Sequence, residues 1–140
     1  MFVKQLSVFM ENREGRLEQA TEVLKNHQIN ILSLSMADTT EYGMLRMVVS
    51  DPELARETLR ENGFSAMLTE VLAVRLEHQV GELHRLTHIL CAEGLNIEYM
   101  YALECAGTRA MIAKVSDGAA AVEAIRRGGL ELYGNQELCG

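Results

Sequence analysis

Several residue types that mark particular classes of protein are scarce or missing. The chain of 140 residues has no tryptophan, one proline and three cysteines (Cys91, Cys105 and Cys139). These cysteines form no close pair and leave one over, so we expect free thiols in a reducing, cytoplasmic compartment. No apolar run approaches the roughly 18 residues of a membrane-spanning helix, and the N-terminus does not resemble a signal peptide. We therefore expect no membrane partner.

Positive charge and catalytic motifs are scarce as well. The chain has 13 Lys and Arg against 20 Asp and Glu, a net charge of −7. Nucleic acids bind clustered basic residues, and the one adjacent basic pair is Arg126-Arg127. No P-loop, Gly-x-Gly-x-x-Gly or Gly-x-Ser-x-Gly motif occurs. We expect no nucleic-acid partner, no cofactor and no enzymatic activity.

What the chain does contain is an internal repeat with a shift of 66 residues. Gly15-Arg16-Leu17 matches Gly81-Glu82-Leu83, Asn30-Ile31 matches Asn96-Ile97, and Val49-Ser50-Asp51 matches Val115-Ser116-Asp117. These residues punctuate secondary structure, so the chain reads as two copies of one module. We predict domains over residues 1–70 and 71–140, each small enough to be marginal alone.

Hydrophobic periodicity predicts the same six elements in each half. Alternating residues predict strands over 3–11, 30–40, 44–49 and 66–69, and again over 71–77, 96–104, 110–115 and 130–133, with 136–138 as a further candidate. Helical spacing predicts helices that begin near Arg16, Pro52, Gly81 and Asp117, with Asp51 as a plausible N-cap. Glu41-Tyr42-Gly43 and Ala106-Gly107-Thr108 read as hairpin turns.

The order βαββαβ in each half is that of the ferredoxin-like α+β fold. We predict two modules paired side by side, with an antiparallel eight-stranded sheet and four helices on one face. No flexible linker separates the halves near Glu70-Val71, so we expect them to be tightly coupled.

This plan resembles the ACT domain, a βαββαβ module that binds amino acids and regulates metabolic enzymes. The resemblance covers nearly the whole chain as two domains in tandem. It is carried by Asn12-Arg13-Glu14-Gly15-Arg16-Leu17, by Ile29-Asn30-Ile31 and by Gly63. Glu14 stands where the family usually has proline. The second turn, His78-Gln79-Val80-Gly81-Glu82-Leu83, keeps only the glycine and the leucine.

The glycine turns are the candidate binding residues. The unpaired amides that open a helix attract anions, so the turns at Gly15 and Gly81 suit the carboxylate of an amino acid. Asn12, Asn30 and Asn96 could accept from its ammonium group. Each of these glycines and asparagines could also be a plain turn residue. We expect Leu17 and Leu83 to belong to the core.

The resemblance implies where the ligand lies. Paired ACT domains usually bind it at their seam, so turn Asn12–Leu17 would face Asn96-Ile97, and turn His78–Leu83 would face Asn30-Ile31. The two turns differ in sequence, which predicts unequal affinities. The chain would be a regulator or sensor of amino-acid metabolism. The sequence leaves open whether it forms a homodimer. Alternatively, it is a regulatory subunit or interaction protein that docks on a separate biosynthetic enzyme, with weak or no ligand binding.

One competing constellation is a metal site. His84, His88 and Cys91 recur at helical spacing, and such residues bind zinc, nickel or copper. Their counterparts in the first half are Glu18, Glu22 and Lys25, which read as a solvated helix face. We therefore predict an exposed face and no metal.

Overall fold

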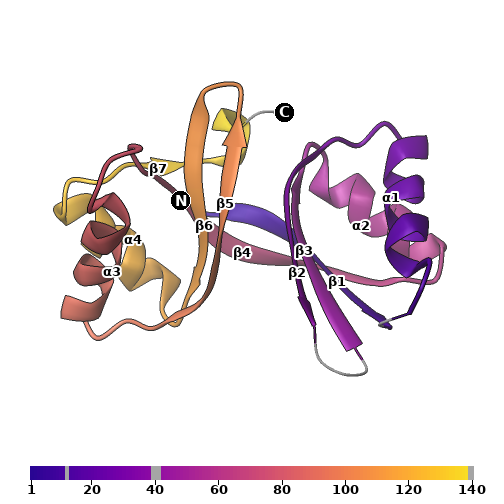
Figure 1. Cartoon of the computed structure of the whole chain (residues 1–140), viewed down its shortest axis with the longest axis horizontal. Coiled ribbons are helices and arrows are strands. Elements are labelled where there is room, and N and C mark those ends of the chain that lie inside the picture. Colours follow the sequence, from indigo (N-terminus) through magenta and orange to yellow (C-terminus); the bar gives the residue numbers. More distant parts are fainter. Residues whose placement is uncertain (12, 39–41, 139–140) are drawn as a thin grey trace. The chain divides into compact units, whose positions relative to one another are not determined.

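The computed structural model describes residues 1–11, 13–38 and 42–138. The chain divides into two compact units. We call Lys4–Thr69 the N-terminal unit, and Met1–Val3 together with Glu70–Cys139 the C-terminal unit. The predicted order of strands and helices is present in both (Figure 1). Among the described residues, no helix has the length and apolar character needed to cross a membrane.

The N-terminal unit is a sheet in the order β2-β3-β1-β4, with two helices on one face (Figure 1). Its elements are β1 (Val3–Glu11), α1 (Arg16–Asn26), β2 (Ile31–Asp38), β3 (Tyr42–Val49), α2 (Pro52–Glu61) and the first part of β4 (Ser65–Arg75). Strand β3 pairs antiparallel with both β1 and β2. Side chains from one face of the sheet, including Leu6, Val8 and Leu45, form the core with Leu24 and Leu59 of the helices.

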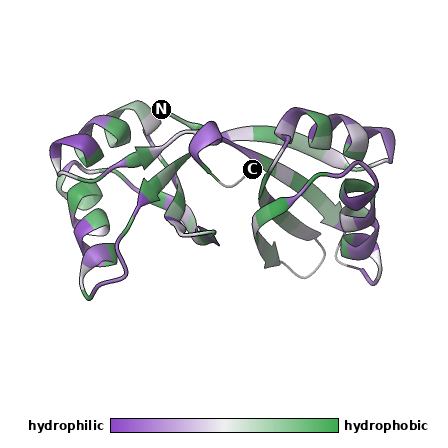
Figure 2. Ribbon diagram, turned by 90° about the horizontal axis from the view of Figure 1, so that it is seen from above, coloured by the Kyte–Doolittle hydropathy of each residue, from purple (hydrophilic) through white to green (hydrophobic). Residues whose placement is uncertain are grey.

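The C-terminal unit repeats this layout. Its elements are the end of β4, α3 (Glu82–Ala92), β5 (Ile97–Cys105), β6 (Thr108–Val115), α4 (Gly118–Arg127), β7 (Leu132–Tyr133) and the short 3₁₀ helix η1 (Asn135–Glu137). Strand β6 pairs antiparallel with β4 and β5, and β7 also pairs with β4. Leu86 and Leu90 of α3 pack with Ile125 of α4 over this sheet. Figure 2 shows hydrophobic and hydrophilic residues mixed along the helices of both units, as expected for helices with one buried side.

The sheet strands number seven among the described residues, so the prediction of eight was wrong. The two strands predicted at 66–69 and 71–77 form the single strand β4, because neither Glu70 nor Val71 breaks an extended chain. The candidate strand at 136–138 is also wrong. It falls largely in η1, where Glu137 Oε1 accepts from the Gly134 amide at 2.9 Å. The pairing of the two modules side by side stays a prediction.

The first hairpin also differs from the sequence reading. Tyr42 and Gly43 were predicted in a turn, but they begin β3, where Tyr42 pairs with Glu11 and Gly43 with Asp38. The third turn residue, Glu41, lies outside the described residues. In the second hairpin Ala106 and Gly107 form a two-residue turn with φ of 47° and 87°. This is the sign pattern that favours tight antiparallel hairpins.

The repeat extends to the caps of the helices. Asp51 Oδ1 accepts from the Leu54 amide at 3.2 Å, and Asp117 Oδ1 accepts from the Ala120 amide at 3.1 Å. Asp51 is therefore the N-cap of α2, as predicted, and Pro52 is its first helical residue. The same shift of 66 residues thus relates the hydrogen bonds of the two units as well as their residues.

Candidate functional site

The two glycine turns have the same backbone geometry. Gly15 has a φ of 87° and Gly81 a φ of 91°, and each precedes the first residue of a helix. The carbonyl of Gly15 accepts from the Gln19 amide at 3.0 Å, and that of Gly81 accepts from the Arg85 amide at 2.9 Å. A Cβ added at either glycine would meet nothing within 4 Å. Glycine is therefore needed here for its positive φ and not for lack of space.

Each turn presents free amides at the start of a helix. Within the described residues, no backbone oxygen accepts from Leu17 and Glu18 in α1, or from Leu83 and His84 in α3. Such amides, together with the helix dipole, favour an anionic group nearby. Asn12, the first residue of the predicted site, lies outside the described residues. Arg13 and Glu14 precede Gly15 as exposed turn residues, and Gln79 and Val80 do so before Gly81.

The charges beside the two turns have opposite signs. Arg16 opens α1, with its guanidinium 4.1 Å from the centroid of the Phe64 ring. Its Nε is buried and has no hydrogen-bond partner among the described residues. The counterpart Glu82 opens α3, and its side chain is only 16% exposed. The residue that opens the helix is therefore positive in one unit and negative in the other, where Glu82 is paired with Arg85 at 3.6 Å.

Leu17 and Leu83 are not core residues, so that expectation was wrong. Leu17 is 37% exposed and Leu83 is 45% exposed. Both belong to the first turn of a helix, beside the glycine turn. The buried positions begin one turn later, at Ala20 in α1 and Leu86 in α3. The exposed leucines make the surroundings of both turns partly apolar.

The asparagines lie far from the turn of their own unit. The Asn30 amide donates to Ser50 Oγ at 2.9 Å, and the Asn96 amide donates to Ser116 Oγ at 3.1 Å. Asn30 follows α1 and Gly15 precedes it, and the 11 residues of α1 that lie between them span roughly 16 Å. One unit therefore does not bring its turn and its asparagine together. Ile31 and Ile97 begin the next strands, where both side chains are partly buried.

The C-terminal unit has a hollow of about 220 Å³ beside its glycine turn. Turn residues and the start of α3 form one wall, and the β5–β6 hairpin forms the other. Its apolar lining is Leu76, Leu83, Ala102, Leu103, Ala110 and Met111. Its polar rim is Glu77, His78, Gln79, Glu82, Glu104 and Arg109. The hollow is thus lined by apolar and polar residues in equal number.

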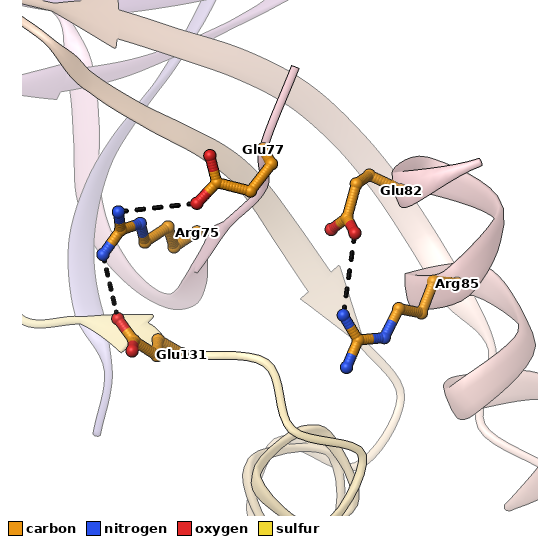
Figure 3. A network of polar contacts seen from close by, with 5 residues as sticks. All are labelled: Arg75, Glu77, Glu82, Arg85 and Glu131. Atoms are coloured by element: carbon orange, nitrogen blue, oxygen red, sulfur yellow. Dashed lines mark hydrogen bonds and ion pairs between the residues drawn. The ribbon is translucent and has the colours of Figure 1, made fainter. Parts of the chain in front are cut away.

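Ion pairs surround the rim. Arg109 Nη2 lies 3.3 Å from both carboxylate oxygens of Glu104. Figure 3 shows Arg75 between Glu77 and Glu131, at 3.5 and 3.2 Å, and Arg85 beside Glu82 at 3.6 Å. The hydrogen bond to Glu131 is the main reason that the pKa of Arg75 is raised above its usual value. The positive charges of these three arginines partly offset the negative charges of the rim carboxylates, which are Glu77, Glu82 and Glu104.

Comparison with known proteins identifies the family. The model of the ACT domain pair matches residues 1–139. The chain belongs to this family. A comparison with curated proteins finds no match.

Solved structures agree with the family assignment. Protein BT0572 from Bacteroides thetaiotaomicron is 34% identical over 95% of this chain and 92% of its own, with a TM-score of 0.89. The regulatory subunit of aspartate kinase from Thermus thermophilus shares the fold at 16% identity, over 89% of this chain and 91% of its own, with a TM-score of 0.62. The regulatory subunit of aspartate kinase from Thermus flavus also shares the fold, at 17% identity over 90% of this chain and 92% of its own, with a TM-score of 0.58. The family and the fold are those that the resemblance implied.

The hairpin side of the hollow was missed by sequence reasoning. Ala102, Arg109 and Met111 belong to strands that read as ordinary structural elements. The repeat did contain a signal, because the counterpart of Ala102 is Met36. The Cε of Met36 would lie 3.3 Å from a Cβ on Gly43, so this long side chain lies over the residue that corresponds to Arg109. A methionine in one unit and an alanine at the matching position of the other predict that the two units differ in the space beside this strand.

The face formed by His84, His88 and Cys91 is exposed, as predicted from its charged counterparts. The two imidazole rings stack with centroids 6.0 Å apart. Within residues 1–11, 13–38 and 42–138, no group of three or more His, Cys, Asp and Glu side chains is placed to hold a metal ion. Cys91 is an exposed free thiol.

Proposed function

We propose that this ACT domain pair binds a free amino acid at the seam between its domains, residues 1–70 and 71–140, and regulates or senses amino-acid metabolism. We further propose that it works in the cytoplasm and has no chemistry of its own. The observation that carries the proposal is the pair of matching glycine turns in a chain of this family. Each offers a positive-φ glycine and free helix amides to an anion.

A ligand that contacts both a glycine turn and an asparagine needs more than one unit. The turn and the asparagine of one unit lie at opposite ends of a helix, too far apart to hold the two ends of one α-amino acid. If both groups contact the ligand, the asparagine comes from the other module or another chain. This is the crossed pairing that the family resemblance implies, and it stays a prediction.

A thermal-shift screen of the twenty amino acids tests the proposal. A ligand that binds only the folded chain raises the free energy of unfolding by RT ln(1 + [L]/Kd). One chemical class should therefore raise the melting temperature at millimolar concentration, while unrelated amino acids should not. If no amino acid shifts the melting temperature, the chain is not an amino-acid sensor.

A second candidate is a regulatory subunit that docks on a separate biosynthetic enzyme. Its support is the fold shared with the regulatory subunits of aspartate kinase, together with exposed apolar side chains at the second turn. Val80 is fully exposed and Leu83 is 45% exposed. Co-purification of one enzyme with the wild-type chain, and its loss with Val80→Asp, would favour this candidate over a free-standing sensor.

A further inference from the structure

We infer that the hollow of the C-terminal unit takes the side chain of an aliphatic amino acid, and that Ala102 sets this preference by leaving the hollow open. The inference rests on the proposed function and deepens it, because it names the class of ligand and the unit that recognises its side chain. Three observations support it: the volume of the cavity, the residues that line it, and the presence of Ala102 where the N-terminal unit has Met36.

The size and lining of the hollow fit a small apolar group. Its volume of about 220 Å³ lies below the roughly 300–1,000 Å³ of pockets for drug-sized ligands. Six of the twelve lining residues are apolar, and Leu83 is 45% exposed there without a ligand. Covering this leucine removes apolar surface from water, which favours an aliphatic side chain over a polar one.

The rim fits the charged end of an α-amino acid. Glu77, Glu82 and Glu104 can accept hydrogen bonds from an ammonium group. Arg109 uses Nη2 for Glu104, and a guanidinium has further N–H donors that suit a carboxylate. Both charges of a zwitterion therefore find a complementary group at the edge of an apolar hollow.

The N-terminal unit has different residues at the corresponding positions. Met36 replaces Ala102, Arg16 replaces Glu82, and Gly43 replaces Arg109. The Met36 side chain lies over Gly43, and the basic Arg16 would repel an ammonium group. Recognition of the ligand's side chain is thus assigned to the C-terminal unit.

Ala102→Met in the full-length chain tests the assignment, with Met36→Ala as the matched control. Both positions are exposed in edge strands, so neither change should prevent folding. With L-leucine as the probe in calorimetry, Ala102→Met should weaken binding at least about tenfold, because the new side chain fills the hollow. Met36→Ala should bind L-leucine as the wild type does.

The methyl signals of the eight methionines locate the ligand independently. Met111 lines the hollow, and Met36 marks the corresponding place in the other unit. L-Leucine should shift the Met111 methyl resonance and leave that of Met36 unchanged. Isoamylamine lacks the carboxylate and 4-methylpentanoate lacks the ammonium group. Each should bind at least about tenfold more weakly, because each leaves part of the charged rim unpaired.

The outcomes separate this inference from the proposed function. If L-leucine binds but shifts Met36 instead, or binds Ala102→Met unchanged, the assignment to this hollow is wrong while amino-acid binding stands. The same holds if L-aspartate or another polar amino acid binds and L-leucine does not. If no amino acid binds at all, both the inference and the proposed function fail.

Discussion

Gln28 and Gly94 occupy matching positions after α1 and α3, and both have a positive φ, of 57° and 70°. The amide of the next residue donates to the carbonyl of Leu24 at 2.9 Å in one unit and of Leu90 at 3.0 Å in the other. This is the common left-handed end of a helix, where glycine avoids the strain that a side chain causes. The C-terminal unit has glycine, the favoured residue, at this position, whereas the N-terminal unit has Gln28.

Gln28→Gly should therefore raise the free energy of unfolding by about 0.5–1 kcal/mol, because relief of backbone strain exceeds the entropic cost of glycine. Gly94→Ala should lower it by about 1 kcal/mol. Urea unfolding of the two variants checks both values. Equal stability of Gln28→Gly and the wild type would mean that Gln28 adopts this conformation without strain.

A second residue-scale prediction concerns pH. A hydrogen bond from Lys4 holds the pKa of Glu53 below its ordinary value of 4.5. A lowered pKa stabilises the fold above the ordinary value, and this contribution is lost as the pH falls below 4.5. Both side chains are about half exposed, so solvent screening limits the contribution to less than about 1 kcal/mol.

Lys4→Gln should accordingly lower the free energy of unfolding at pH 7 and have a smaller effect at pH 3, because protonation of Glu53 removes the negative charge that Lys4 binds. Urea titrations at the two pH values, repeated in 1 M NaCl, measure the difference. A loss that is the same at both pH values would show that Lys4 acts through packing and not through charge.

At the scale of elements, the sequence predicted most helices and strands because local residues specify them. Gly15, Gly81, Asp51 and Asp117 occur where the backbone needs a positive φ or an N-cap, so their spacing located the helix starts. The predicted number of strands was wrong because no local residue shows whether the chain near Glu70 forms one continuous strand or two separate strands. Tyr42 was placed wrongly because its pairing with Glu11 is a long-range contact.

The candidate site was only half predictable for the same reason. The turns are local motifs, whereas the hollow depends on strand pairing. Ala102 pairs with Met111, and this register brings them to the wall opposite Leu83. The exposure of Leu17 and Leu83 also depends on where the sheet ends, which helical periodicity alone does not reveal.

The matching N-caps give a prediction for the helices. Asp51→Ala and Asp117→Ala should each lower the free energy of unfolding by about 0.5–2 kcal/mol, because each removes one side-chain acceptor from a helix start. The control variants Asp51→Asn and Asp117→Asn keep an acceptor and should lose much less. Urea unfolding measures all four, and an asparagine variant as unstable as its alanine partner would contradict the capping role.

At the scale of the whole chain, the C-terminal unit is completed by the first residues of the sequence. Met1–Val3 belong to this unit although most of it begins at Glu70. Phe2 packs against the cluster that contains Leu72, Val122 and Ile125. Its ring also lies against Gly118, where an added Cβ would be 2.7 Å from Phe2 Cε1. A fragment that starts at residue 71 therefore lacks a side chain of its own core.

Phe2→Ala should lower the free energy of unfolding by about 1–3 kcal/mol, since the ring is partly buried. Hydrogen exchange should show the largest loss of protection in β4, β6 and α4.

Gly118→Ala supplies a sharper test. Alanine favours a helix over glycine, by about 1 kcal/mol in a helix interior and by less at this first helical position, yet in the wild type its methyl group would collide with the ring. The substitution should therefore destabilise the wild type and stabilise Phe2→Ala. The coupling between the two changes should be at least about 0.5 kcal/mol. Additive effects would show that the ring does not rest on Gly118, and an unchanged stability of Phe2→Ala would show that the ring contributes little to this unit.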